Sequence, residues 1–496
     1  MTVVREPEIV VIGAGVAGIT MAYTLQRAGF SRFQVLEKGS DVGGVWHWNR
    51  YPGLTCDVPS QLYQFGFAPK PDWSSIWASG PEIQKYHRDV VERFGLTDRI
   101  RLNTTVVSAD FDDASGRWTI VTDSGEQIGA DFVICATGVL HNPATPDIPG
   151  LDEFGGEVVH TARWDDALET DGKRIAVIGT GSTGVQVVSA LQPAAQSLTH
   201  FVRSPQWVLW APMKLRQPRI VAAAFTRMPG LQNRLYDMML WGSAILPDLV
   251  IHDTWRRRTA QLYARLSLRG QIRNRRLRED LTPDYQPLCK RQVISGTYYR
   301  AVRAANAELV TDKIDRITSN GIRTADGREH PTDVIVLATG FRAHDYMRPM
   351  RVTGRDGRGL DQIWADGPRA YRMTAIPGLP NLFTVLGPNS PTGSISLQYS
   401  AEVTARYIVE WLERFRRGEL DTVEVTEEAT AEFNRQVAEA MVPTVWNTGC
   451  NSWYFTEGGN IDLWPFTRST LTTMLKTPDD AHFHFECITS TVSPTA

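Results

Sequence analysis

Residues Phe154 to Asp165 read FGGEVVHTARWD, and they lie between two glycine-rich segments of similar pattern. Each glycine-rich segment follows a short apolar run and precedes a helical pattern, which is the order of a buried strand, a tight turn and a helix. The stretch 154–165 ends shortly before the second of these segments begins. We therefore expect it to join two nucleotide-binding units, and the rest of the chain is placed relative to this junction.

The first glycine-rich segment contains Gly13, Gly15 and Gly18 and follows the apolar run Glu8–Ile12. Such a turn lets backbone N–H groups approach a pyrophosphate at the N-terminus of a helix. The next expected strand ends at Glu37, whose carboxylate would accept hydrogen bonds from ribose hydroxyls and repel a 2′-phosphate. The site therefore suits FAD or NAD, with a ligand-free glycine turn as the simpler alternative.

A dense run of glycine and aromatic residues extends from Gly43 to Gly53, and Asp57 follows it. Paired glycines allow a close backbone approach, and Trp46 and Trp48 offer flat apolar faces. A flavin needs such walls around its ring system, whereas each Trp alone would also be explained by core packing. The cluster favours FAD at the first site.

The second glycine-rich segment, GTGSTG from Gly179 to Gly184, follows the apolar run Arg174–Ile178. The next expected strand ends at Arg203 and Ser204, at the position that Glu37 occupies in the first unit. A guanidinium at this position can pair with a 2′-phosphate, which favours NADP over NAD. A solvated surface Arg is the alternative. Two unlike dinucleotide sites in one chain imply hydride transfer between their cofactors.

These patterns predict an α/β protein with two dinucleotide-binding Rossmann-type domains and a helical insertion. We place the first part of a FAD-binding domain at residues 1–142, because residues 97–137 read as β-rich and end in a strand followed by Ala-Thr-Gly. An NADP-binding domain should occupy residues 151–340, with the helical insertion at about 212–285. Residues 341–496 should return to the FAD-binding domain and add a C-terminal segment.

Composition excludes several classes of protein. The chain has 496 residues, 42% hydrophobic and 22% charged, with a net charge of -3, which gives no reason to expect a nucleic-acid partner. The five cysteines form no CxxC pair and no His/Cys cluster, so we expect neither a metal site nor a disulfide framework. Scattered cysteines, the absence of a secretory pattern and the absence of a membrane-length apolar run together predict a cytoplasmic protein.

The stretch from Asp253 to Asp280 looks helical and is rich in arginine. Leu262, Leu266, Leu277 and Ile272 would supply only a partial apolar face. A helix lying on a membrane surface is one interpretation, so peripheral membrane contact stays open. A solvated lid helix is the interpretation that we favour at this point.

Two further patterns make the chain resemble the flavin-dependent type I Baeyer–Villiger monooxygenases. The family fingerprint FxGxxxHxxxW followed by Pro or Asp is matched by Phe154, Gly156, His160, Trp164 and Asp165. A second family pattern, [A/G]GxWxxxx[F/Y]P[G/M]xxxD, is matched by Gly43, Gly44, Trp46, Tyr51, Pro52, Gly53 and Asp57. Related monooxygenases that oxygenate nitrogen or sulfur usually carry Tyr in place of Trp164.

The resemblance implies a reaction and two catalytic residues. NADPH would reduce FAD, O2 would add at flavin C4a, and the resulting peroxyflavin would attack a ketone to give an ester or lactone. Arg291 matches the arginine that stabilises the peroxide, and Asp57 matches its carboxylate partner. A fixed cation beside a developing oxyanion in a dry site is a large electrostatic contribution.

The resemblance also implies the nucleotide contacts. Lys290, with Arg203 and Ser204, matches the positions that hold the 2′-phosphate, and Trp453 matches a Trp that contacts NADP near the substrate. His160 would be a structural and conformational residue. From the residue patterns and the resemblance, the residues expected to bind FAD or NADP are Gly13, Gly15, Gly18, Glu37, Lys38, Gly44, Val45, Trp46, Trp48, Asp57, Tyr63, Val106, Thr137, Gly138, Gly179, Gly181, Ser182, Thr183, Gly184, Arg203, Ser204, Lys290, Arg291, Leu397 and Trp453.

Other activities stay open at this point. The main alternative is an oxygenase acting on sulfur or nitrogen of small apolar substrates, and another is a non-catalytic NADP-responsive protein. A disulfide reductase is disfavoured, because no paired cysteines follow the first site. The expected substrates are O2 and a small apolar carbonyl compound. The ending GCNSWY…LWP resembles the subgroup that acts on aryl ketones and long-chain carbonyls. The sequence does not indicate the oligomeric state.

Overall fold

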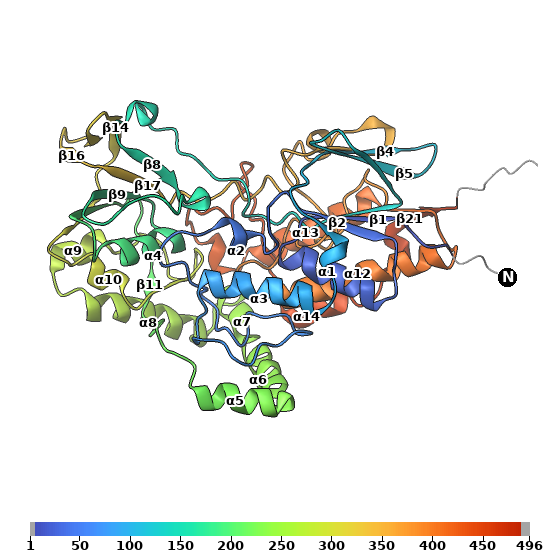
Figure 1. The fold of residues 1–496 in the computed structure, drawn as a ribbon, viewed down its shortest axis with the longest axis horizontal. Coiled ribbons are helices and arrows are strands. Elements are labelled where there is room, and N and C mark those ends of the chain that lie inside the picture. The colour runs from blue at the N-terminus through green and yellow to red at the C-terminus, as the bar shows by residue number, and fades with distance from the viewer. Residues whose placement is uncertain (1–4, 488–496) are drawn as a thin grey trace, which may run out of the picture.

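Two five-stranded parallel sheets organise the computed structural model, which describes residues 5–487. Figure 1 shows them in two lobes that lie side by side. The first sheet has the order β19-β7-β1-β2-β3 and consists of Leu382–Thr384, Phe132–Cys135, Ile9–Ile12, Phe33–Leu36 and Ile100–Arg101. The second has the order β13-β10-β9-β17-β8 and consists of Ala307–Val310, Ser197–Phe201, Arg174–Ile178, Val334–Leu337 and Glu157–His160. The predicted α/β fold with two Rossmann-type units is confirmed.

The central strands are apolar because helices or further strands cover both of their faces. Every residue of β1 is buried, as is every residue of β17. In the first lobe, α1 (Val16–Arg27) packs along α12 (Leu397–Arg416). In the second lobe, α4 (Ser182–Leu191) packs against α10 (Tyr298–Ala301).

The first lobe is built from both ends of the chain. A four-stranded sheet combines β4 (Val106–Asp112), β5 (Arg117–Thr122) and β6 (Gln127–Ala130) with β18 (Arg351–Thr353). Since β18 pairs with β4, the chain has returned to this lobe after the second sheet. Its remaining regular elements are α2 (Val45–Trp48), α3 (Gly80–Arg93), α11 (Leu360–Ile363), α13 (Glu427–Met441), α14 (Arg468–Met474), β20 (Thr422–Val425) and β21 (Phe483–Glu486).

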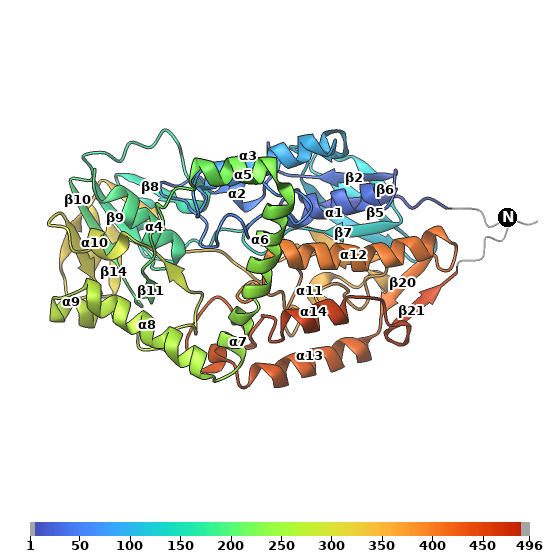
Figure 2. The ribbon, with the colours of Figure 1, turned by 90° about the horizontal axis from the view of Figure 1, so that it is seen from below.

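Smaller elements complete the second lobe. An antiparallel sheet consists of β14 (Ile314–Thr318), β15 (Gly321–Thr324) and β16 (Glu329–Pro331). The short strands β11 (Val208–Leu209) and β12 (Val293–Ile294) flank the helical insertion and pair with each other. The insertion consists of α5 (Arg219–Arg227), α6 (Pro229–Gly242), α7 (Ile245–Ile251), α8 (Trp255–Gln271) and α9 (Arg275–Asp280), and Figure 2 shows α5 to α8 crossing the underside of the molecule.

The single helix expected over 253–280 is wrong, because two helices, α8 and α9, form there. The chain breaks between α8 and α9, where Ile272 is extended and buried. Of the expected partial apolar face, Leu262 and Leu266 are exposed. The buried face of α8 contains Arg257, whose guanidinium donates to the carbonyl oxygens of Leu249 and Val250 at 2.9 Å each. Tertiary packing against these carbonyls and against β11 therefore decided which face is inside.

The expectation of no disulfide is also wrong. Cys289 and Cys450 are bonded, although they stand 161 residues apart in the chain. Both side chains are buried. Pairing required the fold to bring two distant segments together, which spacing along the chain does not show. None of the helices within residues 5–487 combines the length and apolarity needed to cross a bilayer.

Candidate active site

The first glycine turn closes β1 onto α1 so tightly that side chains are excluded. Gly13 has φ +103°, and a Cβ there would lie 2.6 Å from the carbonyl oxygen of Ala136. A Cβ at Gly18 would lie 1.8 Å from the carbonyl oxygen of Gly13. Gly15 directly precedes α1 and has no side chain that could cap the first N–H groups of the helix. These donors fit a pyrophosphate.

Glu37 stabilises the first turn through hydrogen bonds. Its carboxylate is buried and accepts hydrogen bonds from the backbone N–H groups of Ala14 and Gly39, at 2.7 Å each. The residue thus connects the glycine turn to the loop that follows β2. Its contact with a ribose remains a prediction.

The glycine and aromatic cluster lies directly beside this turn. Gly44, with φ +56°, faces Gly15 so closely that a Cβ on it would lie 3.0 Å from the Gly15 Cα. Val45 begins the short helix α2, and the indole of Trp46 donates to the hydroxyl of Tyr63 at 2.9 Å. The structure therefore brings the two expected flavin-binding segments together.

The other expected flavin contacts lie at the edges of this region. Val106 is buried in a cluster with β1 and β2 side chains, and Leu397 begins α12. Thr137 and Gly138 follow β7, which is the strand beside β1. No described atom would lie within 4 Å of a Cβ at Gly138. Open space there fits a ligand at the carboxyl ends of the strands.

The second glycine turn repeats the same construction. Gly179 has φ +119°, and its Cβ would lie 2.3 Å from the carbonyl oxygen of Ala338. A Cβ at Gly184 would lie 2.1 Å from the carbonyl oxygen of Gly179. At Gly181, which precedes Ser182 and Thr183 of α4, a Cβ would meet no described atom within 4 Å. This open helix N-terminus fits a second pyrophosphate.

Three residues expected to hold a 2′-phosphate converge beside this turn. The Lys290 ammonium lies 3.5 Å from the Ser204 hydroxyl and 4.4 Å from the centre of the Tyr285 ring. Burial lowers the pKa of Lys290; the charge of Asp284 acts against this shift, and the charge of Arg203 acts in the same direction. An anion placed between these two cations would stabilise both of them.

Arg291 and Asp57 form an ion pair between the two lobes. The Arg291 Nη2 donates to both carboxylate oxygens of Asp57 at 3.0 Å, and Nε donates to Oδ2 at 3.1 Å. A further N–H of Arg291 donates to the carbonyl oxygen of Thr392 at 3.0 Å. The charge of Asp57 raises the pKa of Arg291 above its ordinary value, so the side chain stays a cation.

A small cavity lies behind this ion pair. It is lined by Thr392, which accepts from Arg291, and by Trp453, Asp462 and His344. Burial raises the pKa of Asp462, whose carboxylate accepts from the Tyr346 hydroxyl and lies 3.6 Å from the His344 imidazole. No sequence motif pointed to this acidic group. Its neighbours come from separate segments of the chain.

The disulfide holds the two sides of this region together. Cys289 directly precedes the Lys290–Arg291 pair, and Cys450 begins the segment that ends at Trp453. The Thr448 hydroxyl also contacts the Cys289 sulfur at 3.4 Å. The covalent link therefore fixes the position of the Trp453 segment relative to the arginine.

The stretch 154–165 joins the lobes through aromatic and cationic contacts. Its strand β8 is the edge of the second sheet and pairs with β17. The Arg163 guanidinium lies 4.8 Å from the centre of the Trp48 ring, and the Lys38 ammonium lies 5.7 Å from it. Burial lowers the pKa of Lys38, with Arg163 acting in the same direction. Trp48 thus connects both nucleotide units.

Within this stretch, His160 turns the chain at the end of β8. Its Nδ1 accepts from the backbone N–H of Ala162 at 3.1 Å, while Nε2 is buried without a partner among the described residues. Burial lowers the pKa of His160, so the ring is neutral near pH 7. A Cβ at Gly156 would lie 2.3 Å from the carbonyl oxygen of Asp333. Trp164 is buried in the main core, while Asp165 caps the next turn.

The motif Tyr51-Pro52-Gly53 packs against α4 of the second unit. The Tyr51 hydroxyl donates to the side chain of Gln186 at 2.9 Å, and Gln186 donates to the carbonyl oxygen of Thr55 at 2.8 Å. A Cβ at Gly53 would lie 2.9 Å from the backbone oxygen of Gln186. This motif therefore also sets the distance between the lobes.

Comparisons with known proteins agree with this architecture. A family model described as pyridine nucleotide-disulphide oxidoreductase matches residues 10–218. A Baeyer–Villiger monooxygenase of Pseudomonas aeruginosa is 36% identical over 470 residues, covering 93% of this chain and 88% of that protein. The chain belongs to the Baeyer–Villiger monooxygenase family. An uncharacterized monooxygenase of Mycobacterium bovis is 48% identical over 474 residues, covering 95% of this chain and 94% of its own length.

Solved structures also align over nearly the whole length of the chain. Cyclohexanone monooxygenase from Rhodococcus sp. Phi1 bound to NADP+ superimposes with a TM-score of 0.86 at 29% identity, covering 97% of this chain and 99% of that chain. The predicted resemblance is therefore confirmed. The two sequence patterns of the family, at residues 154–165 and 43–57, lie where the two lobes of the protein meet.

Proposed function

We propose that the protein is an NADPH-consuming, FAD-dependent monooxygenase that inserts one oxygen atom of O2 next to the carbonyl of a small apolar ketone, giving an ester or a lactone. The ion pair between Arg291 and Asp57 carries this proposal, because it fixes a permanent cation where the two nucleotide turns converge. When bound, FAD supplies the activation of O2, and NADPH supplies the hydride that this activation consumes.

The first lobe provides the FAD site. The first-turn N–H groups of α1, beginning at Gly15, would hold the pyrophosphate, and Glu37 keeps that turn in place. Gly44 brings the backbone of the aromatic cluster close to the same turn. Trp46 and Trp48 would enclose the ring system and exclude water from one side.

The second lobe provides the NADP site. The open N-terminus of α4 at Gly181 would hold the pyrophosphate. Arg203, Ser204 and Lys290 would bind the 2′-phosphate, since two cations and a hydroxyl present complementary charge and donors. This set distinguishes NADPH from NADH. We also propose that the domain boundaries follow residues 1–142, 151–340 and 341–496.

In the reaction, Arg291 would donate hydrogen bonds from its N–H groups to the reacting oxygen atom, on which negative charge develops. Asp57 fixes the guanidinium plane and keeps it charged, so little reorganisation is needed as that charge moves. Thr392 occupies one N–H of the guanidinium and so limits its rotation. His160, which is neutral and stands at the end of β8 opposite Leu337 of β17, positions the junction and does not act as a base.

The experiment that tests this function uses paired substrates. Purified protein is supplied with FAD, NADPH and O2, and with a ketone and a sulfide of matched carbon skeleton. The expected product is an ester from the ketone, formed with NADPH consumption in equal amount. Sulfoxide formation without any ester would assign the protein to heteroatom oxygenation instead, and NADPH oxidation that yields only hydrogen peroxide would reject the oxygenase function for these substrates.

A further inference from the structure

Exposed apolar side chains gather on the helical insertion. Most of the large apolar side chains that stand exposed within residues 5–487 lie between Trp210 and Leu266. Ile220 is 80% exposed, Trp241 75% and Trp255 71%. Single exposed apolar residues are common, but a concentration of this kind in one part of the fold indicates an interaction surface. None of the nucleotide-binding or catalytic contacts described above uses these side chains.

The helix α6 exposes large apolar side chains while it buries the amide of Gln232. Leu231, Met238 and Trp241 recur at helical spacing on the exposed side. The inner side carries Gln232 and Tyr236, which are buried. An ordinary surface helix turns its large apolar side chains toward the core rather than toward solvent. Burial of the apolar face against something other than water would explain it.

Hydrogen bonds hold α6 in this orientation. Gln232 donates to the carbonyl oxygen of Lys70 at 2.7 Å and to the side chain of Gln61 at 3.1 Å. Since these are contacts of a buried amide, rotating the helix to hide its apolar face would leave polar groups unpaired. The outward apolar face is therefore built into the fold.

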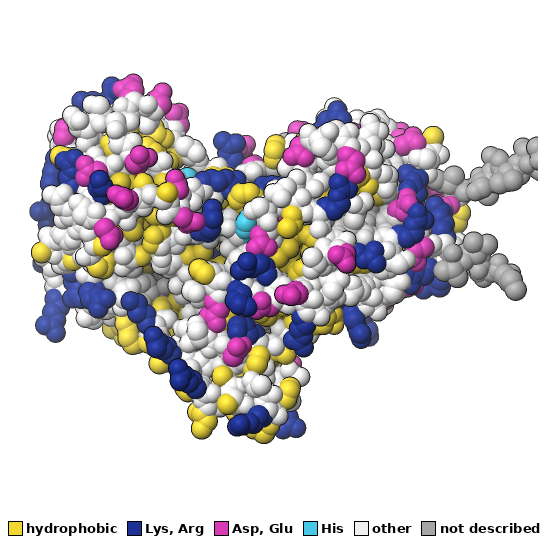
Figure 3. Space-filling model, in the orientation of Figure 1, with side chains coloured by type: hydrophobic (Ala, Val, Ile, Leu, Met, Phe, Trp, Pro, Cys, Tyr) yellow, Lys and Arg dark blue, Asp and Glu magenta, His cyan; other side chains and the backbone are white. Residues whose placement is uncertain are grey.

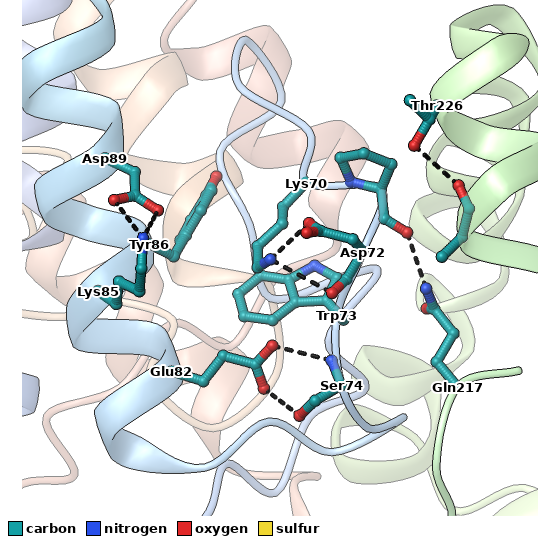
Figure 4. A network of polar contacts seen from close by, with 12 residues as sticks. Lys70, Asp72, Trp73, Ser74, Glu82, Lys85, Tyr86, Asp89, Gln217 and Thr226 are labelled. Atoms are coloured by element: carbon teal, nitrogen blue, oxygen red, sulfur yellow. Dashed lines mark hydrogen bonds and ion pairs between the residues drawn. The ribbon is translucent and has the colours of Figure 1, made fainter. Parts of the chain in front are cut away.

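The segment that leads into α5 is anchored to the loop of the first lobe that contains Lys70. Figure 4 shows Gln217 beside the loop around Trp73, and its side chain donates to the carbonyl oxygen of Pro71 at 2.7 Å. On the other side of that loop, Ser74 donates its backbone N–H and its hydroxyl to Glu82 of α3. The base of the α5–α6 projection is thus fixed to the body of the protein.

Positive charge surrounds the apolar face. Between Lys214 and Gly242 the sequence holds one acidic residue, Asp237. The exposed cations of this segment are Lys214, Arg216, Arg219, Arg227 and Arg234. Figure 3 shows dark-blue side chains along the segment leading into α5, and yellow and dark-blue side chains on the tip that α5 and α6 form. The chain as a whole has a net charge of -3, so this charge is local.

We propose that α5 and α6, with the exposed edge of α8, dock on a bilayer that contains anionic phospholipid. The apolar side chains would enter the region between headgroups and acyl chains, where Trp is favoured, and the cations would lie among phosphates. A second copy of the chain fits less well. A two-fold symmetric contact would bring two copies of the same basic cluster, which contains Arg219, Arg227 and Arg234, into one interface.

Vesicle flotation of the holoenzyme tests this proposal. Binding is measured on vesicles of phosphatidylcholine alone and of phosphatidylcholine mixed with phosphatidylglycerol. The unmodified protein should float with the mixed vesicles and lose binding at high salt. Replacing Arg219, Arg227 and Arg234 by Gln should weaken binding by on the order of a hundredfold, since each cation near an anionic surface contributes about fivefold.

Matched variants separate the apolar face from exposed apolar residues elsewhere. The double variant Ile220→Ser with Trp241→Ser should lose most of its binding, and the control Val107→Ser with Phe485→Ser should keep it. Flavin absorbance and circular dichroism confirm that each variant is folded. Equal binding to both vesicle types, no binding at all, or a dimer that Trp241→Ser dissociates would each overturn the proposal, the last by assigning this face to a second copy.

Discussion

Replacing Arg291 by Ala should separate cofactor reduction from oxygen insertion. In the structure, Arg291 makes three hydrogen bonds of 3.0 to 3.1 Å with Asp57 and one of 3.0 Å with Thr392. Losing such a fixed donor typically lowers kcat by about 100- to 1,000-fold. Hydride transfer should continue near its normal rate, because the residues that would hold NADPH, Arg203 and Lys290, are unchanged.

Two further substitutions define the role of the geometry. Arg291→Lys retains the charge but cannot form the two-pronged contact with Asp57, so its oxygenation rate should fall between those of the unmodified protein and Arg291→Ala. Asp57→Asn retains the shape but removes the charge that holds the guanidinium, and it should also slow oxygenation. Because the Arg291 and Asp57 side chains are 37% and 17% exposed, the pair should contribute only about 1–2 kcal/mol to stability.

Rapid mixing under anaerobic conditions measures flavin reduction by NADPH, and product analysis after the admission of O2 measures ester formation. Folding of each variant is checked by thermal unfolding and by flavin content. Normal ester formation by Arg291→Ala would refute the proposed role of this arginine. An equal loss of both steps would instead place Arg291 in nucleotide binding alone.

Three further outcomes follow from the structure. Arg203→Ala should raise KM for NADPH by about 10- to 100-fold while leaving KM for NADH unchanged, because only NADPH carries the 2′-phosphate; equal changes for both would contradict the assignment. The bond between Cys289 and Cys450 closes a long loop and should contribute about 2–5 kcal/mol to the free energy of unfolding. A reductant should therefore lower the Tm of the unmodified protein but not that of Cys289→Ser. Thiol titration of the native protein that finds all five cysteines free would contradict this bond. Burial lowers the pKa of His200 to about 4, so protonation of this residue favours the unfolded protein. The free energy of unfolding should therefore be highest above pH 6.5 and should be about 2 kcal/mol lower at pH 5. Chemical denaturation at pH 7 and pH 5 should show this decrease, and His200→Asn should reduce it.

The nucleotide-binding frame could be predicted from the sequence because its requirements are local. Gly13 and Gly184 are fixed by contacts with backbone only a few residues away or on the adjacent strand, and the strand–turn–helix pattern shows where those contacts fall. Glu37 and Arg203 both follow the second strand of their unit, so the sequence alone shows that the two nucleotide sites differ in charge.

The features that the sequence did not show depend on tertiary contacts. The pairing of Cys289 with Cys450 and the placing of Asp462 beside His344 join segments that no short-range pattern connects. The orientation of α6 follows from where the Gln232 amide finds its acceptors, which overrides the apolar pattern of the helix. Hydrophobic periodicity predicts the existence of a helix better than it predicts which of its faces is buried.

The most direct test of the proposed chemistry is a crystal structure of the protein with FAD and NADP bound. The Arg291 guanidinium should face the reactive edge of the flavin ring while keeping its contact with Asp57, and Arg203 and Lys290 should contact the 2′-phosphate. A structure in which Arg291 points into bulk water, far from the flavin ring, would contradict the proposed oxygen insertion even with both nucleotides in place.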